Sequence, residues 1–285
     1  MVSLEYLRQR IQQKRELARL ASAVIDERIA ACVARHRIAL EKISARDAQL
    51  IIKEVRGDLR MLASRFQNNT GIEERSALLA ARCYRQLLLT HASSAARIAD
   101  YPFLKKELAA RKVTSIADLG SGLNPLALAV PGRVYYAVDI QEDELALVSR
   151  FFQQEGIAGT TLVCDLRTSL PALPSVDACL LMNVLDVIEK RKGHKRAEEI
   201  LTSITAKYFF ITFSTKTLSG KPMRHPQRGW IERLLTRRGY VWKRTPLSSE
   251  ILYIAESHCS TACRSSGSGS GSSNFRSPED KLDAG

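Results

Sequence analysis

The chain has 285 residues, of which 45% are apolar and 26% charged, and its formal net charge is +13. This composition supports a packed core, and the absence of any run of about 18 apolar residues excludes a membrane-spanning protein. The charge is uneven: residues 1–112 carry +10, residues 113–206 carry −4, and residues 207–245 carry +9. Two basic segments around an acidic centre favour a polyanionic partner such as nucleic acid.

The first 112 residues have a helical pattern. Similar patterns cover 38–52 and 72–89, and Asn68, Asn69 and Gly71 mark a break. We predict that residues 1–112 form a basic, all-helical domain. Near its start, apolar residues recur every three or four positions: Leu4, Leu7, Ile11, Leu17, Leu20 and Val24.

From Val113 onward, short apolar segments alternate with helical ones, which predicts an α/β sheet. The last two predicted strands are separated by a few residues that include Pro246, which favours an antiparallel hairpin. We predict a catalytic domain over 113–257, with a Rossmann-like, mostly parallel sheet and an antiparallel terminal hairpin. The predicted strands cover 113–120, 134–140, 160–166, 176–185, 207–214, 239–245 and 251–256.

The Gly/Ser-rich residues 258–285 predict a disordered tail. This segment holds His258, Cys259 and Cys263, whose spacing lacks the second ligand pair of a zinc site. We therefore expect no metal. The dispersed cysteines fit a reducing cytoplasm.

A glycine-rich turn follows the first strand, over Asp118-Leu-Gly-Ser-Gly-Leu-Asn-Pro125. Gly120 and Gly122 allow close backbone approach to a ligand, and a helix is expected to begin near Pro125. Asp139 ends the second strand, where nucleotide-binding folds place an acid that binds ribose hydroxyls. Pro125 stands in place of the third glycine of a dinucleotide fingerprint, so NAD is disfavoured.

A third acid, Asp165, ends the third strand, where it could contact an adenine. Three acids at successive strand ends define one crevice at the carboxyl edge of the sheet. S-adenosylmethionine has a ribose and an adenine but no pyrophosphate. The pattern therefore predicts an S-adenosylmethionine-dependent methyltransferase.

Over roughly residues 50–257 the chain resembles the aminoglycoside-resistance 16S rRNA methyltransferases, which methylate guanine N7 in the ribosomal decoding site. The resemblance implies a cytoplasmic enzyme, acting as a monomer, whose helical domain docks on the small ribosomal subunit. The matching motifs are THASSAARI (90–98), ADLGSGLNPLAL (117–128), AVDI (137–140), DACLLMNVLDVIEK (177–190), TFSTKTLSGK (212–221) and EILYI (250–254).

The resemblance also implies roles for individual residues. Arg97 would pair with the methionine carboxylate of the cofactor. No residue is identified as a certain catalytic group, and Asn183, Lys216 and Lys221 are positioning candidates. The implied RNA-binding residues are Lys216, Thr217, Lys221 and Arg224. The implied cofactor-binding residues are His91, Ser93, Arg97, Asp118, Gly120, Ser121, Gly122, Asn124, Asp139, Ile140, Asp165, Leu166 and Met182.

The chain departs from the family near the expected target pocket. Asn183 stands where the family tends to have Lys, and Lys216 and Lys221 stand in a segment that usually carries arginines. Guanine N7 has an exposed lone pair, so the absence of an obvious general base is expected. Three alternatives stay open: methylation of another RNA, a small-molecule methyltransferase, and a non-catalytic RNA-binding relative.

Overall fold

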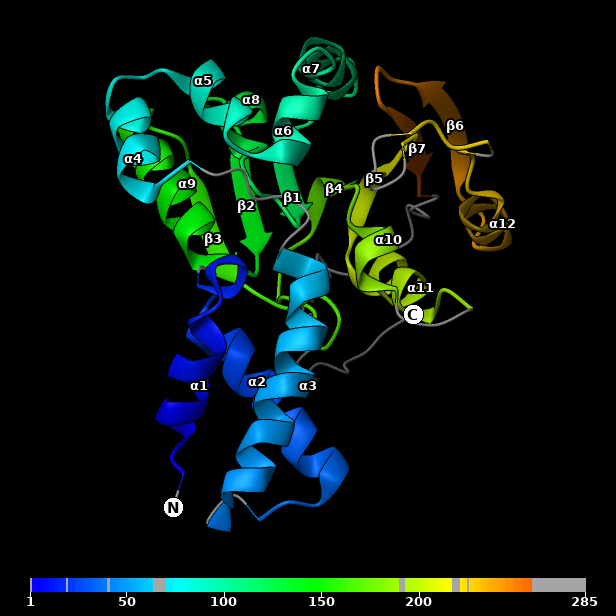
Figure 1. The fold of residues 1–285 in the computed structure, drawn as a ribbon. Helices are drawn as coiled ribbons and strands as arrows, with labels where there is room; N and C mark the ends of the chain where they lie inside the picture. The colour runs from blue at the N-terminus through cyan, green and yellow to red at the C-terminus, as the bar shows by residue number, and fades with distance from the viewer. Residues whose placement is uncertain are drawn as a thin grey trace, which may run out of the picture.

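The computed structural model describes residues 2–18, 20–39, 42–63, 70–189, 193–216, 221–224 and 226–257. The predicted tail and Thr217 lie outside the described residues. A group of N-terminal helices lies at one end of an open sheet, and further helices flank the sheet (Figure 1). Among the described residues, no helix combines the length and the apolar character needed to cross a membrane.

The first helices form a small core of their own. They are α1 (Leu4–Gln12), the 3-10 helix η1 (Arg15–Leu17), α2 (Ser22–His36) and α3 (Ala45–Ala63). Their buried side chains include Leu7, Ile29 and Leu59, and Ile140 and Val187 from the sheet region pack against them. The predicted helix over 38–52 starts only at Ala45, because a side chain caps it there. The Ser44 hydroxyl accepts a hydrogen bond from the Asp47 N–H (3.1 Å).

The next helices, α4 (Ile72–Ala80), α5 (Tyr84–Leu89), α6 (Ala92–Arg97) and α7 (Tyr101–Ala110), belong to a different core. Apolar residues from these helices, among them Leu79 and Leu104, pack with side chains from the sheet. The single helix suggested by the 72–89 pattern is split, because Arg82 adopts a left-handed backbone (φ 55°) between α4 and α5. The hydrophobic packing thus separates α1–α3 from α4–α7.

The sheet has seven strands in the order β3-β2-β1-β4-β5-β7-β6. Strands β1 to β5 pair in parallel, whereas β7 is antiparallel to both β5 and β6. This confirms the predicted mostly parallel sheet with an antiparallel terminal hairpin. The strands are β1 (Ser115–Leu119), β2 (Val134–Asp139), β3 (Gly159–Val163), β4 (Val176–Met182), β5 (Ala206–Ser214), β6 (Val241–Pro246) and β7 (Glu250–Glu256).

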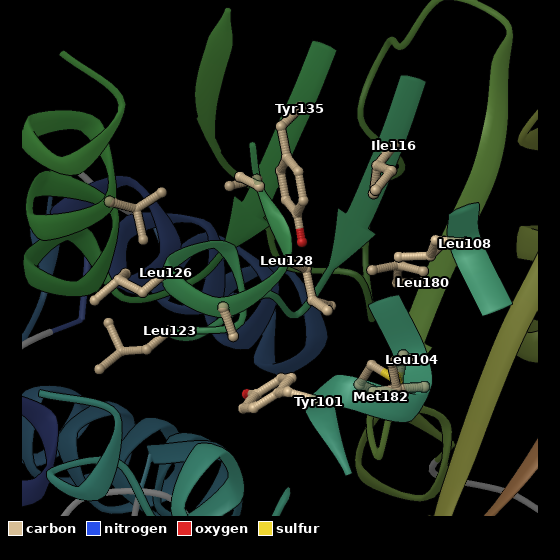
Figure 2. Packing of buried hydrophobic residues seen from close by; sticks show 14 of the residues in the cluster. Tyr101, Leu104, Leu108, Ile116, Leu123, Leu126, Leu128, Tyr135, Leu180 and Met182 are labelled. Carbon is tan, nitrogen blue, oxygen red and sulfur yellow. The ribbon is translucent and has the colours of Figure 1, made fainter. Parts of the chain in front are cut away.

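Alternate residues along the strands supply the two sheet faces. Figure 2 shows one face, where Tyr135, Leu180 and Met182 pack with Leu104 and Tyr101 of α7. On the other face, residues such as Cys179 and Phe209 pack against helices α11 (Lys195–Ser203) and α12 (Gly229–Arg237). The remaining helices are α8 (Pro125–Leu128), α9 (Glu142–Gln154) and α10 (Leu185–Ile188).

Candidate active site

The turn after β1 approaches its neighbours very closely. Gly120 and Gly122 both have positive φ angles, of 74° and 47°. A Cβ atom on Gly122 would lie 2.8 Å from Cε1 of His91, and one on Gly120 would lie 2.8 Å from Cγ2 of Val184. Only glycine therefore fits at these two positions, where the turn packs directly against His91 and Val184.

Asp139, at the end of β2, holds this turn. Its Oδ2 accepts the Gly122 N–H (2.9 Å), and its Oδ1 accepts the N–H groups of Ile140 (2.7 Å) and Gln141 (3.0 Å). Burial raises the pKa of Asp139 to about 6, although these backbone N–H groups oppose the shift. About one of the four acceptor positions of the carboxylate is left for a ligand hydroxyl.

Asp118 lies beneath the turn. It is fully buried, and its Oδ2 accepts a hydrogen bond from the Tyr135 hydroxyl (2.7 Å). Burial raises the pKa of Asp118 to about 7, with the Tyr135 hydrogen bond opposing. Asp118 therefore supports the turn from inside the protein.

Arg97, the predicted partner of the cofactor's carboxylate, already holds a protein carboxylate. Its Nε and one terminal nitrogen donate to the two oxygens of Glu250 (3.1 and 2.7 Å). The guanidinium also donates to Asn124 Oδ1 (2.7 Å) and Ser93 Oγ (3.2 Å). Arg97 is 1% exposed. Through its hydrogen bonds to Glu250 and Asn124, it links β7 to the glycine turn.

His91 caps α6 and covers the turn. Its Nδ1 accepts the Ser94 N–H (3.4 Å), and the side chain is 6% exposed. Burial lowers the pKa of His91, so the imidazole is neutral at neutral pH. Both the capping role and the predicted site role are therefore compatible with its position.

Asp165, two residues beyond β3, is held by two arginines. Its carboxylate accepts hydrogen bonds from Arg28 Nε (3.0 Å) and from Arg167 Nε (3.1 Å). Burial opposes ionisation, but the hydrogen bonds and charges of Arg167 and Arg28 lower the pKa of Asp165 to about 2. Sequence reasoning missed Arg28, because this residue lies 137 positions away.

Asn183 follows β4 with a left-handed backbone (φ 60°), a conformation that Asn tolerates better than most residues. Its N–H donates to the Thr212 carbonyl (3.1 Å), and its Oδ1 accepts the Ser214 N–H (3.2 Å). Asn183 thus joins the end of β4 to the end of β5. A lysine at this position would lose the Asn amide oxygen that Ser214 uses.

These strand ends surround one cleft, which contains about 620 Å³ of empty space including its open mouth. Sequence reasoning missed five of the residues that line the cleft. Three of them recur at the three- and four-residue spacing of a helix face, which could have indicated them: Val184, Val187 and Ile188. The other two, Gln141 and Cys164, are sequence neighbours of predicted site residues. The predicted residues that line the cleft are His91, Ser93, Gly120, Gly122, Asp139, Ile140, Asp165, Leu166, Met182 and Asn183.

Seven predicted residues do not line this cleft among the described parts of the chain. Arg97, Asp118, Ser121 and Asn124 lie buried in or beneath the glycine turn. The predicted RNA-binding residues Lys216, Lys221 and Arg224 are exposed, and Lys216 pairs with Pro222 in an isolated bridge.

The family model for ribosomal RNA methyltransferases of the FmrO type matches residues 11–254. The chain belongs to this family. It is 29% identical over 129 residues to the 16S rRNA (guanine(1405)-N(7))-methyltransferase of Micromonospora olivasterospora, and the match covers 43% of each chain. The aligned part thus spans less than half the length of this curated relative.

Solved structures of rRNA methylases have the same fold as this member of the FmrO family. The 16S rRNA methyltransferase RmtF, in complex with S-adenosyl-L-homocysteine, is 24% identical with a TM-score of 0.72, over 88% of this chain and 97% of RmtF. The 16S rRNA methylase RmtB is 18% identical with a TM-score of 0.71, over 90% and 99%. An rRNA methylase from Escherichia coli is 17% identical with a TM-score of 0.67, over 88% and 98%.

Proposed function

We propose that this protein transfers a methyl group from S-adenosylmethionine to N7 of a guanine in the 16S rRNA of the small ribosomal subunit, conferring aminoglycoside resistance. Family membership and the guanine-N7 activity in the name of the Micromonospora relative support this. The observation that carries the proposal is the cleft, because nine of the thirteen residues implied for the cofactor line it.

The residues around the cleft fit this cofactor. Gly120 and Gly122 bring the turn into direct contact with Val184 and His91, which line the cleft, and Asp139 keeps an acceptor position for a ribose hydroxyl. The apolar side chains of Leu166, Val184 and Ile188 would cover the adenine.

The proposed chemistry requires positioning more than proton transfer. S-adenosylmethionine supplies a methyl group that is already activated on a sulfonium ion. Guanine N7 presents a lone pair with no proton to remove, so the chain needs groups that orient the base. Asn183, in the wall of the cleft, is our first positioning candidate, with Lys216 and Lys221 on the segment after β5.

We further propose that the N-terminal helices dock the protein on the rRNA, as the 1–112 domain prediction suggests, and that the protein acts as a monomer in the cytoplasm. Cationic side chains exposed on α1–α3 and their connections would contact phosphates without regard to sequence. They include Lys14, Arg35, Arg37, Lys42, Arg46 and Lys53.

Methylation of another RNA is the second candidate, because Asn183 departs from the family where the target base would be positioned. Incubation with labelled cofactor and either intact small subunits or total tRNA, followed by mapping of the methyl groups, separates the two. We expect one N7-methylated guanine in the 16S rRNA. Asp139→Ala should abolish labelling, whereas Glu142→Ala, an exposed carboxylate three residues away, should not. Labelling of tRNA alone would replace the first proposal by the second.

A further inference from the structure

Two arginines converge on the carboxylate of Asp165 in the wall of the cleft. Arg28, from α2, donates through Nε (3.0 Å) and a terminal nitrogen to Oδ2. Arg167 donates through its backbone N–H (2.9 Å), Nε (3.1 Å) and a terminal nitrogen (2.9 Å). These five N–H groups fill the roughly four lone-pair positions of a carboxylate. Asp165 therefore has no acceptor position left for an adenine amino group.

The same cluster extends to α3. The Asp58 carbonyl accepts a hydrogen bond from Arg167 (3.2 Å), and its carboxylate lies 3.8 Å from Arg28 and 3.7 Å from Arg167. The side chains of Arg28, Arg167 and Asp165 are 7%, 3% and 1% exposed. Because these charges are buried, each depends on its partners far more than a surface ion pair does.

The N-terminal helices also contact the segment after β2. The Ala21 N–H donates to the Ile140 carbonyl (3.1 Å), and Leu20 forms a bridge with Gln141. Ile140 lines the cleft and packs against the core of α1–α3. Helix α2 and the residues just before it therefore contact two segments that line the cleft, one beyond β2 and one beyond β3.

We propose that Arg28 is a positioning residue for cofactor binding. By holding Asp165, it fixes the segment 164–166 that forms the adenosine side of the cleft, so the helices proposed to dock on rRNA also set the affinity for the cofactor. This inference rests on the proposed function. Asp165 serves as the anchor of that segment, and the adenine is held by the shape of the wall.

The test compares the full chain with Arg28→Ala and Arg28→Lys, using calorimetry with S-adenosyl-L-homocysteine below the melting temperature of each variant. We expect Arg28→Ala to raise the dissociation constant at least tenfold. Arg28→Lys keeps the charge but loses the two-pronged geometry, so it should raise the dissociation constant about threefold. If Arg28→Ala fails to fold, the dissociation constant of Arg28→Lys still tests the proposal.

Arg8→Ala is the matched control, because Arg8 pairs with Asp26 (2.6 Å) within the same helices but away from the cleft. The affinity of Arg8→Ala for S-adenosyl-L-homocysteine should equal that of the wild type. Unchanged affinity in folded Arg28 variants, with a lowered melting temperature alone, would show a purely structural role and overturn the inference. Failure of the wild-type protein itself to bind S-adenosyl-L-homocysteine would instead overturn the proposed function.

Discussion

At the residue scale, three aspartates at or just beyond the ends of successive strands differ because their surroundings differ. Asp118 is fully buried and accepts a hydrogen bond from one tyrosine hydroxyl, and burial raises its pKa to about 7. Asp139 meets three backbone N–H groups and has a pKa of about 6. Asp165 meets two arginines, and its pKa falls to about 2. Of the three, Asp139 alone combines a place in the cleft with a remaining acceptor position, so we propose that it makes the ribose contact.

The raised pKa of Asp139 predicts a pH dependence. A raised folded-state pKa contributes stability that is fully present below about pH 4 and is lost as the pH rises through about 6. A ribose contact has the opposite preference, because the ionised carboxylate is the better acceptor. We expect the affinity for S-adenosyl-L-homocysteine to fall as the pH drops below about 6, up to tenfold per unit.

Calorimetry between pH 5 and 8 measures this dependence. Asp139→Asn should bind more weakly at pH 8 and lose most of the pH dependence. Any slope left in that variant belongs to another group, of which His91, in the wall of the same cleft, is one candidate. Equal slopes in the wild type and Asp139→Asn would contradict the assignment of the ribose contact.

At the element scale, buried charge joins helices that are distant in the sequence. Arg75 on α4 pairs with Glu144 on α9, and both side chains are 1% exposed. The two helices lie side by side on one flank of the sheet (Figure 1). Burial is the main cause of the lowered pKa of His91, and the charges of Glu144 and Arg75 act on that pKa in opposite directions.

Removal of one partner should therefore destabilise the protein strongly. We expect Arg75→Ala to lower the free energy of unfolding by about 3–5 kcal/mol, since Glu144 is left as an uncompensated buried charge. Urea denaturation followed by circular dichroism measures this loss. Arg150→Ala removes an exposed contact between the same helices, to Ser76 (3.0 Å), and should cost about 0.5 kcal/mol or less. A similar small loss for both variants would show that the buried pair contributes little.

At the scale of the whole molecule, two basic segments flank an acidic centre along the sequence, and the cleft-lining residues Ile140 and Asp165 contact the N-terminal helical region. Arg46 and Lys53 are exposed on α3, seven residues apart, and so lie on one face of that helix. Lys105 and Lys106 are exposed on α7, at the opposite end of the molecule (Figure 1). The proposed docking function therefore predicts different effects for these two pairs of cations.

Charge reversal tests this difference. We expect Arg46→Glu with Lys53→Glu to weaken binding to small ribosomal subunits and to reduce the slope of log affinity against log salt by about 1 per lost phosphate contact. Lys105→Glu with Lys106→Glu changes the net charge equally and should leave the slope nearly unchanged. Filter binding over a range of salt concentrations provides the measurement. Equal effects of the two pairs would point to general charge attraction in place of a docking face.

Much of the fold could be predicted because it depends on local patterns. All seven predicted strands are present, and the predicted helix start at Pro125 is confirmed. Helix ends were less predictable: the cap at Ser44 and the left-handed Arg82 depend on single side-chain and backbone conformations. The cofactor assignments stay predictions, although the structure brings most of those residues to one cleft.

The α/β class, the glycine turn and the acids at the strand ends could be read from the sequence, because periodicity and backbone preference act between near neighbours. Which charges meet depends on how distant segments pack. Arg97 pairs with Glu250 across 153 positions, and Arg28 pairs with Asp165 across 137. The physical reason is that burial makes such pairing obligatory without specifying the partner, which is set by how the helices pack on the sheet.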